Sequence, residues 1–235
     1  MSPNLSRRGF LGCACCAAAS VGFGADLPAA AAEGPRTHLT PDQALDLLKE
    51  GNRSFKTDSP VRAVQGRERR LEIARGQTPF AILVSCSDSR VPPELLFGRG
   101  LGELFIVRNA GNTVDTAAIG TIEYGVAALG VPLIVVMGHE KCGAVDAAVK
   151  VVTENATFPG SIGRMVEPII PAVLAARREG GDLIHAAVRA NVCRTVARLR
   201  TDEPLLLEPL RAKKLRVIGA AYDLYDGSVD FFDEG

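Results

Sequence analysis

Short, almost continuously apolar runs recur along this 235-residue chain and alternate with longer segments of helical periodicity. A strand that is buried on both faces reads as such a run, because neither of its faces meets water. Strands that alternate with helices predict an α/β fold, with a mostly parallel sheet flanked by helices. The four runs that we interpret as strands are residues 80–85, 104–107, 133–137 and 215–221, and residues 228–232 are a candidate fifth, antiparallel edge strand.

Several segments between these runs carry helix signals. Thr40, Pro41 and Gln43 together form a typical helix start, with a capping threonine, a proline in the first turn and a glutamine three residues after the cap. A basic helix is expected over residues 61–75. Apolar residues recur at helical spacing in two further segments, Ile119, Ile122, Val126 and Leu129 in one and Ile184, Val188, Val192, Val196 and Leu199 in the other. His185 lies within the second of these patterns, and we expect it to pack.

The first 32 residues are interpreted as an export signal and residues 33–235 as a single folded domain. Arg7 and Arg8 follow a serine and precede Phe10 and Leu11, an arrangement that resembles a twin-arginine signal. An alanine-rich stretch follows, and residues 30–32 form an A-x-A cleavage site. The alternative is an ordinary apolar N-terminal helix. Export by the twin-arginine route predicts a periplasmic or other extracytoplasmic location.

Charge and cysteine content exclude several classes of protein. Basic and acidic residues balance at 27 each, and the chain has no Trp, so neither nucleic acid nor a membrane surface is expected as a partner. Three of the six cysteines lie in the predicted signal, which leaves Cys86, Cys142 and Cys193. An odd count argues against a disulfide framework.

Chemically reactive side chains follow two of the predicted strands. Cys86, Asp88 and Arg90 come directly after the first run, and His139 and Cys142 follow the third. Ligand sites of open α/β sheets form beyond the carboxyl ends of strands, so two thiols and an imidazole converge if these two strands are neighbours. Two cysteines and one histidine are a known ligand set for catalytic zinc, with a fourth position left open.

Each of these residues also has an ordinary structural interpretation. A single cysteine is more often a small buried hydrophobe, and a single histidine is more often a hydrogen-bonded core residue. An Asp–Arg pair is often no more than a structural ion pair. The joint placement at two strand ends favours the metal site.

With these motifs, the chain resembles the β-class carbonic anhydrases over about residues 40–232. The resemblance rests on Cys-x-Asp-x-Arg at 86–90 and His-x-x-Cys-Gly at 139–143, supported by Gly-Gln-x-Pro at 76–79 and Phe-Ile-Val-Arg-Asn at 105–109. It implies the β-carbonic anhydrase fold, one Zn²⁺ per subunit held by Cys86, His139 and Cys142, and a homodimer or higher homo-oligomer.

The resemblance also implies roles for the remaining site residues. Asp88 and Arg90 are the catalytic pair that gates the open zinc position: Asp88 held by Arg90 leaves that position to water, and released Asp88 can occupy it. Gln77 is expected to donate a hydrogen bond to the substrate, Phe105 and Tyr124 to line the apolar part of the pocket across a dimer interface, and Gly143 to contact substrate. The first three of these resemble the plant-type subclass. From pattern alone, core packing is the simpler interpretation of Phe105 and Tyr124.

The implied activity is the reversible hydration of carbon dioxide to bicarbonate and a proton by zinc-bound hydroxide. Two alternatives remain open at this point. A related enzyme on the same scaffold could hydrolyse carbon disulfide or carbonyl sulfide. A non-catalytic zinc-binding relative would keep the metal ligands but need not keep Asp88, Arg90 or Gln77, all of which are present.

Overall fold

The computed structural model describes residues 35–59, 63–178 and 181–233. The predicted export signal, residues 1–32, lies outside these described residues. Within them, no helix has both the length and the apolar character that a membrane crossing requires.

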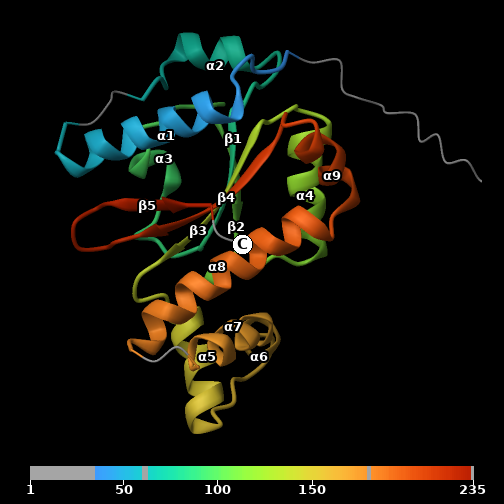
Figure 1. Ribbon diagram of the computed structural model, residues 1–235. Coiled ribbons are helices and arrows are strands. Elements are labelled where there is room, and N and C mark those ends of the chain that lie inside the picture. The colour runs from blue at the N-terminus through green and yellow to red at the C-terminus, as the bar shows by residue number, and fades with distance from the viewer. Residues whose placement is uncertain (1–34, 60–62, 179–180, 234–235) are drawn as a thin grey trace, which may run out of the picture. The chain divides into compact units, whose positions relative to one another are not determined.

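A five-stranded sheet forms the centre of the described domain, in the order β2-β1-β3-β4-β5 (Figure 1). The strands are β1 (Ala81–Ser85), β2 (Leu104–Arg108), β3 (Leu133–His139), β4 (Arg216–Tyr222) and β5 (Val229–Phe232). The first four strands are parallel and β5 pairs antiparallel with β4, which confirms the predicted mostly parallel sheet and its fifth edge strand. Strands β1 and β3 are neighbours, as convergence of the two motifs requires.

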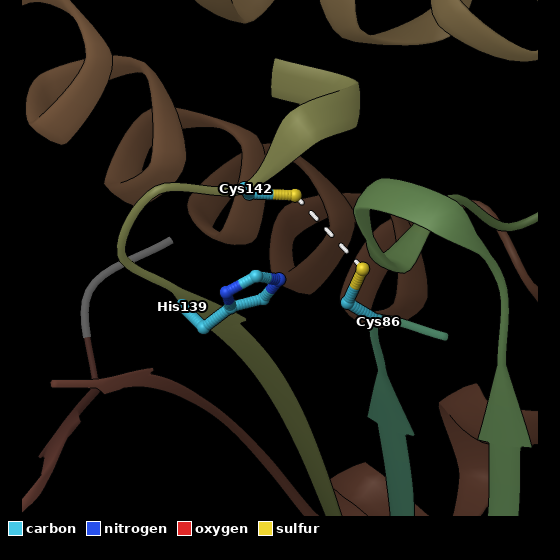
Figure 2. Close-up of side chains that lie close together, drawn as sticks. All are labelled: Cys86, His139 and Cys142. Atoms are coloured by element: carbon cyan, nitrogen blue, oxygen red, sulfur yellow. Dashed lines mark hydrogen bonds between the residues drawn. The ribbon is translucent and has the colours of Figure 1, made fainter. Parts of the chain in front are cut away.

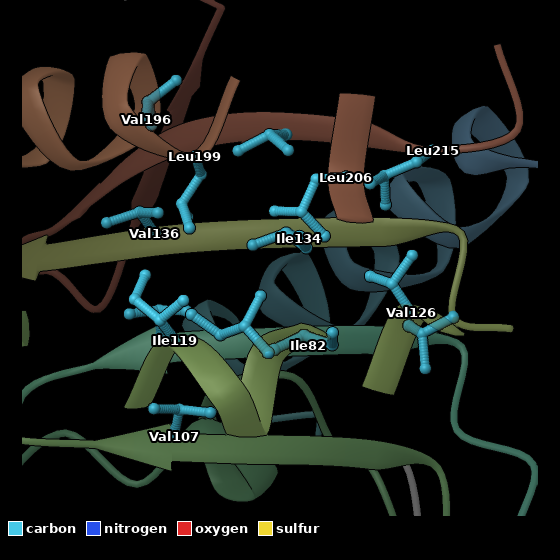
Figure 3. Packing of buried hydrophobic residues seen from close by; sticks show 14 of the residues in the cluster. Ile82, Val107, Ile119, Val126, Ile134, Val136, Val196, Leu199, Leu206 and Leu215 are labelled. Carbon is cyan, nitrogen blue, oxygen red and sulfur yellow. The ribbon is translucent and has the colours of Figure 1, made fainter. Parts of the chain in front are cut away.

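Helices cover both faces of this sheet. On one face lie α1 (Pro41–Lys56) and α3 (Pro93–Leu96), and on the other lie α4 (Thr116–Ala127), α8 (Leu183–Thr201) and α9 (Pro204–Arg211). Strand β1 serves both layers, since Ile82 and Val84 point into the α4–α8 layer while Ala81 and Leu83 point into the α1 layer. Figure 3 shows Ile82 with Ile134 and other side chains of the α4–α8 layer. All five residues of β1 are buried, which explains its continuous apolar character.

The helix signals had mixed success. Helix α1 begins after Thr40 with the complete predicted capping box. Helix α8 covers the second periodic segment, whereas α4 ends at Ala127, before Leu129 of the first. The basic helix is shorter than predicted: α2 spans Arg67–Ile73, not residues 61–75. Gly66 precedes it without a side-chain cap, and none of its residues is buried, so no packed face extends it in either direction.

Several helices had no clear sequence signal. They are α5 (Gly143–Glu154), α6 (Ile162–Val166) and α7 (Ile170–Ala176), with the 3-10 turns η1 (Ala110–Asn112) and η2 (Glu167–Ile169). Pro168 and Pro171 stand in the first turns of η2 and α7, where proline is tolerated although it interrupts a helical pattern in sequence. Together with part of α8, these elements form a third apolar cluster, which contains Cys86 and Cys142. This cluster therefore encloses the predicted ligands.

Candidate metal centre

Three buried side chains converge at the carboxyl ends of β1 and β3. Cys86 directly follows β1, His139 is the last residue of β3, and Cys142 precedes α5 (Figure 2). One nitrogen or sulfur atom from each lies within 4.8 Å of the others. The parallel pairing of neighbouring strands brings Cys86 close to Cys142, which is 56 positions further along the sequence.

The geometry of these three groups fits a single zinc ion. The Cys86 and Cys142 sulfurs are 3.9 Å apart, and two sulfurs on a tetrahedral zinc, each at about 2.3 Å from it, would be about 3.8 Å apart. Nδ1 of His139 lies 2.8 Å from the carbonyl oxygen of Glu140, so Nδ1 carries the proton and Nε2 presents its lone pair. Among the described residues, Nε2 is buried and has no hydrogen-bond partner. A metal ion would satisfy this atom.

The two thiols influence each other strongly. A hydrogen bond from Cys142 lowers the pKa of Cys86 to about 4, and the backbone amide of Gly111 acts in the same direction. The same contact with Cys86 raises the pKa of Cys142, because a second negative charge beside the first is unfavourable. One thiolate therefore forms readily, and a divalent cation is what would stabilise both.

Asp88 lies beside the triad and is held by Arg90. Its Oδ1 accepts hydrogen bonds from the Arg90 Nε and backbone amide, both at 2.9 Å, and its Oδ2 accepts one from Nη2 at 2.7 Å. These bonds hold the pKa of the Asp88 carboxyl well below its usual range. Oδ2 is 3.8 Å from Nε2 of His139. The carboxylate thus faces the ligand set while Arg90 occupies both of its oxygens.

Arg108 is a site residue for which sequence reasoning assigned no role. It ends β2, and its side chain donates to the carbonyl oxygens of Cys86 at 2.8 Å and of Asp88 at 2.6 Å. It therefore fixes the backbone of the loop that carries Cys86 and Asp88. The sequence does not reveal this role, because it depends on the pairing of Ser85 in β1 with Arg108 in β2. That pairing follows only from the order of the strands in the sheet.

Comparison with known proteins decides the family. A family model described as "Carbonic anhydrase" matches residues 81–229, which is more than half of the chain. The chain belongs to the carbonic anhydrase family. "Carbonic anhydrase 2" of Mycobacterium tuberculosis is 40% identical over 191 residues, covering 81% of this chain and 92% of that protein. The "Carbonic anhydrase" of Mycolicibacterium smegmatis is 39% identical over 190 residues, with the same coverage of 81% and 92%.

Solved structures assign this family member to the β class. The β-carbonic anhydrase CcaA has a TM-score of 0.64 and 28% identity, over 80% of this chain and 95% of CcaA. One of two tetrameric β-carbonic anhydrases from Sordaria macrospora also has a TM-score of 0.64, with 26% identity over 69% of this chain and 84% of that one. The predicted β-carbonic anhydrase fold is confirmed.

Three of the expected pocket residues lie away from the triad of Cys86, His139 and Cys142 in the same chain. Gln77 is exposed and precedes β1, whereas Cys86 follows it, and the five residues of β1 alone cover about 17 Å at about 3.3 Å per residue. Phe105 is level with Ile82 in the strand register, so it too lies below the carboxyl edge of the sheet. Its ring lies 6.2 Å from that of Tyr124, which is 51% exposed.

The fourth expected residue, Gly143, is the first residue of α5, next to Cys142. It lines an open cleft of about 780 Å³ that also contains Glu140 and His185. His185 does not pack as expected: its side chain is 64% exposed, and its Nδ1 lies 3.6 Å from a carboxylate oxygen of Glu140. His185 lies in the first turn of α8, where the helix borders this cleft and is not covered by other elements of the described chain.

Proposed function

We propose that this β-class carbonic anhydrase uses one zinc ion per chain, bound by Cys86, His139 and Cys142, to interconvert carbon dioxide and bicarbonate. The observation that carries the proposal is the buried set of two sulfurs and one ring nitrogen, within 4.8 Å of one another, whose Nε2 has no hydrogen-bond partner among the described residues. When bound, zinc would lower the pKa of a coordinated water and so make hydroxide available near neutral pH. Three protein ligands leave one position for that chemistry.

Asp88 and Arg90 control access to this open position. The two-pronged contact, with hydrogen bonds from Nε at 2.9 Å and Nη2 at 2.7 Å, keeps both carboxylate oxygens engaged. Oδ2 remains only 3.8 Å from His139 Nε2, so a short movement would bring it within reach of the metal. By holding the Asp88 carboxylate in these hydrogen bonds, Arg90 prevents it from acting as a fourth ligand of the zinc ion.

A second chain completes the pocket in this proposal, which corresponds to the plant-type subclass and a homodimer or higher homo-oligomer. Gln77, Phe105 and Tyr124 lie away from the triad of their own chain, and β2 is one of the two edge strands of the sheet. Helix α2 buries none of its residues, and Leu71 on it is 57% exposed. An edge strand with exposed apolar neighbours is a surface that a second copy could cover. Gln77 of one chain would then donate a hydrogen bond to substrate at the triad of the other.

Residues 1–32 are proposed to direct export by the twin-arginine route, with residues 33–235 as the mature domain. The support is the Arg7-Arg8 pair and the A-x-A site at residues 30–32. The route carries folded proteins, so Cys86 and Cys142 could take up zinc in a reducing compartment first. Replacing both arginines with lysine should retain the protein inside the cell, whereas unchanged secretion would contradict this route.

Substrate competition tests the catalytic proposal. Stopped-flow measurements on the zinc-loaded protein should show rapid hydration of carbon dioxide and no comparable hydrolysis of carbon disulfide or carbonyl sulfide. Turnover of only the sulfur compounds would show that the protein is instead a hydrolase of carbon disulfide or carbonyl sulfide. Bound zinc without turnover of any of the three would identify a non-catalytic family member.

A further inference from the structure

The sulfur of Cys86 accepts a hydrogen bond from a backbone amide outside its own loop. Gly111, in η1, donates its N–H to Cys86 Sγ at 3.3 Å. The residue has a positive φ of 66°, and a Cβ there would come within 2.6 Å of Ile169 Cδ1. The position therefore needs glycine, and glycine alone does little to hold its own backbone orientation, because it has the widest conformational freedom of all residues.

A buried side chain on a distant helix anchors this glycine. Asn191 of α8 is 4% exposed, and its Nδ2 donates to the carbonyl oxygen of Gly111 at 2.9 Å. The two residues are 80 positions apart in sequence. The N–H and the carbonyl of Gly111 belong to peptide units joined at its Cα, so fixing the carbonyl restricts the direction of the N–H. Loss of the Asn191 amide would also leave the buried carbonyl without this donor.

We propose that Asn191 is a positioning residue that tunes the Cys86 thiolate through Gly111. An amide N–H directed at a thiolate withdraws negative charge from the sulfur and stabilises the ionised form. Asn191 thereby holds the Gly111 N–H on the Cys86 sulfur and weakens the electron donation of that sulfur to a bound metal. Asn191 contacts neither the substrate nor the metal. This inference rests on the proposed metal site and adds an outer contact that controls one of its ligands.

Cobalt substitution tests this role with a signal other than activity. In the Co²⁺-loaded protein, the thiolate-to-metal charge-transfer band reports electron donation by sulfur. Asn191→Leu removes the amide and keeps a side chain of similar size. We expect the band to move to longer wavelength, because the sulfur donates more strongly without the hydrogen bond. We expect Co²⁺ and Zn²⁺ affinity, measured by chelator competition, to fall roughly 10- to 100-fold, because the sulfur loses the contact that orients it toward the metal.

Thr195→Val is the matched control. Thr195 lies one turn further along α8 and is also buried, at 7% exposed. Its hydroxyl donates to the Asn191 backbone carbonyl and not to the Asn191 side chain. This variant should keep the wild-type band and metal affinity. Should Asn191→Leu fail to fold, Asn191→Ala tests the same loss of the donor.

The outcomes separate this inference from the proposed function. A folded Asn191 variant with the wild-type band and affinity would overturn the inference alone. A shift of equal size in Thr195→Val would overturn it too, because the effect would then be one of general packing. Wild-type protein that binds Co²⁺ without any thiolate band would instead contradict the metal site itself.

Discussion

The proposed pocket shared between two chains predicts that mixing two inactive variants restores activity. The variants are Cys142→Ala, which removes a metal ligand, and Gln77→Ala, which removes the proposed substrate donor. Gln77 precedes β1 and Cys86 follows it, and the strand between them covers about 17 Å. A hydrogen bond needs a donor within about 3 Å of its acceptor. A chain therefore cannot use its own Gln77 at its own triad, and Gln77→Ala alone should lower the rate roughly 100-fold.

The expected recovery follows from how lesions combine in a two-fold dimer. In a mixed dimer, one pocket contains both lesions, while the other combines an intact triad from the Gln77→Ala chain with an intact Gln77 from the Cys142→Ala chain. Random pairing of equal amounts makes about half of all dimers mixed, so about one quarter of the wild-type activity should return. A larger cyclic oligomer built from such dimers gives the same fraction.

The assay is stopped-flow hydration of carbon dioxide by co-expressed, differently tagged chains, normalised to total protein. A mixture of Cys142→Ala with Cys86→Ala is the control, since both lesions damage a triad and no pairing yields an intact one. Activity of the first mixture that equals the average of its two components, as in the control, would refute the shared pocket.

The remaining predictions concern the gate, the sheet and the C-terminal edge. Arg90→Ala should free Asp88 to bind the open position of the zinc ion and so lower the hydration rate sharply without loss of zinc. Asp88→Ala should keep zinc but lose this inhibition. Unchanged activity in Arg90→Ala would contradict the gate. A methyl group at Gly138 would come within 2.8 Å of a side chain of α8, so Gly138→Ala should lower the free energy of unfolding by about 1–3 kcal/mol in denaturant titrations. Burial raises the pKa of Asp233, but hydrogen bonds from two arginines outweigh this and lower it overall. Its pairing therefore stabilises the fold above about pH 4 and is lost as the pH falls through the depressed value. Since the carboxylate is half exposed, Asp233→Asn should cost no more than about 1 kcal/mol at pH 7 and less near pH 3; an equal cost at both pH values would oppose this sign.

Burial patterns made most of the sheet and the ligand set predictable. Strands such as β1 and β3 are almost continuously apolar because they are buried along their whole length, and the triad residues lie at or just beyond the carboxyl ends of these strands. What sequence could not supply was contact between neighbours that are remote along the chain. Arg108 acts through the pairing of β2 with β1, and Asn191 acts through the packing of α8 against η1.

Other features depended on local context that sequence patterns do not carry. Helix α2 is short because, in the part of the chain that the structure describes, nothing buries a face of it. His185 reads as part of an apolar helix pattern, yet it lies at the end of α8 that borders an open cleft. Gln77 matches a family motif, but β1 lies between it and Cys86. This placement supports the proposal that Gln77 acts at the triad of another chain.

Zinc content and carbon dioxide hydration measured on the same preparation test the central claim most directly. The account predicts about one zinc per chain, a hydration rate proportional to the zinc bound, loss of both on chelation, and recovery of both when zinc is returned. Cys142→Ala should lose zinc and activity together. Metal-free protein that hydrates carbon dioxide at the full rate would contradict the account.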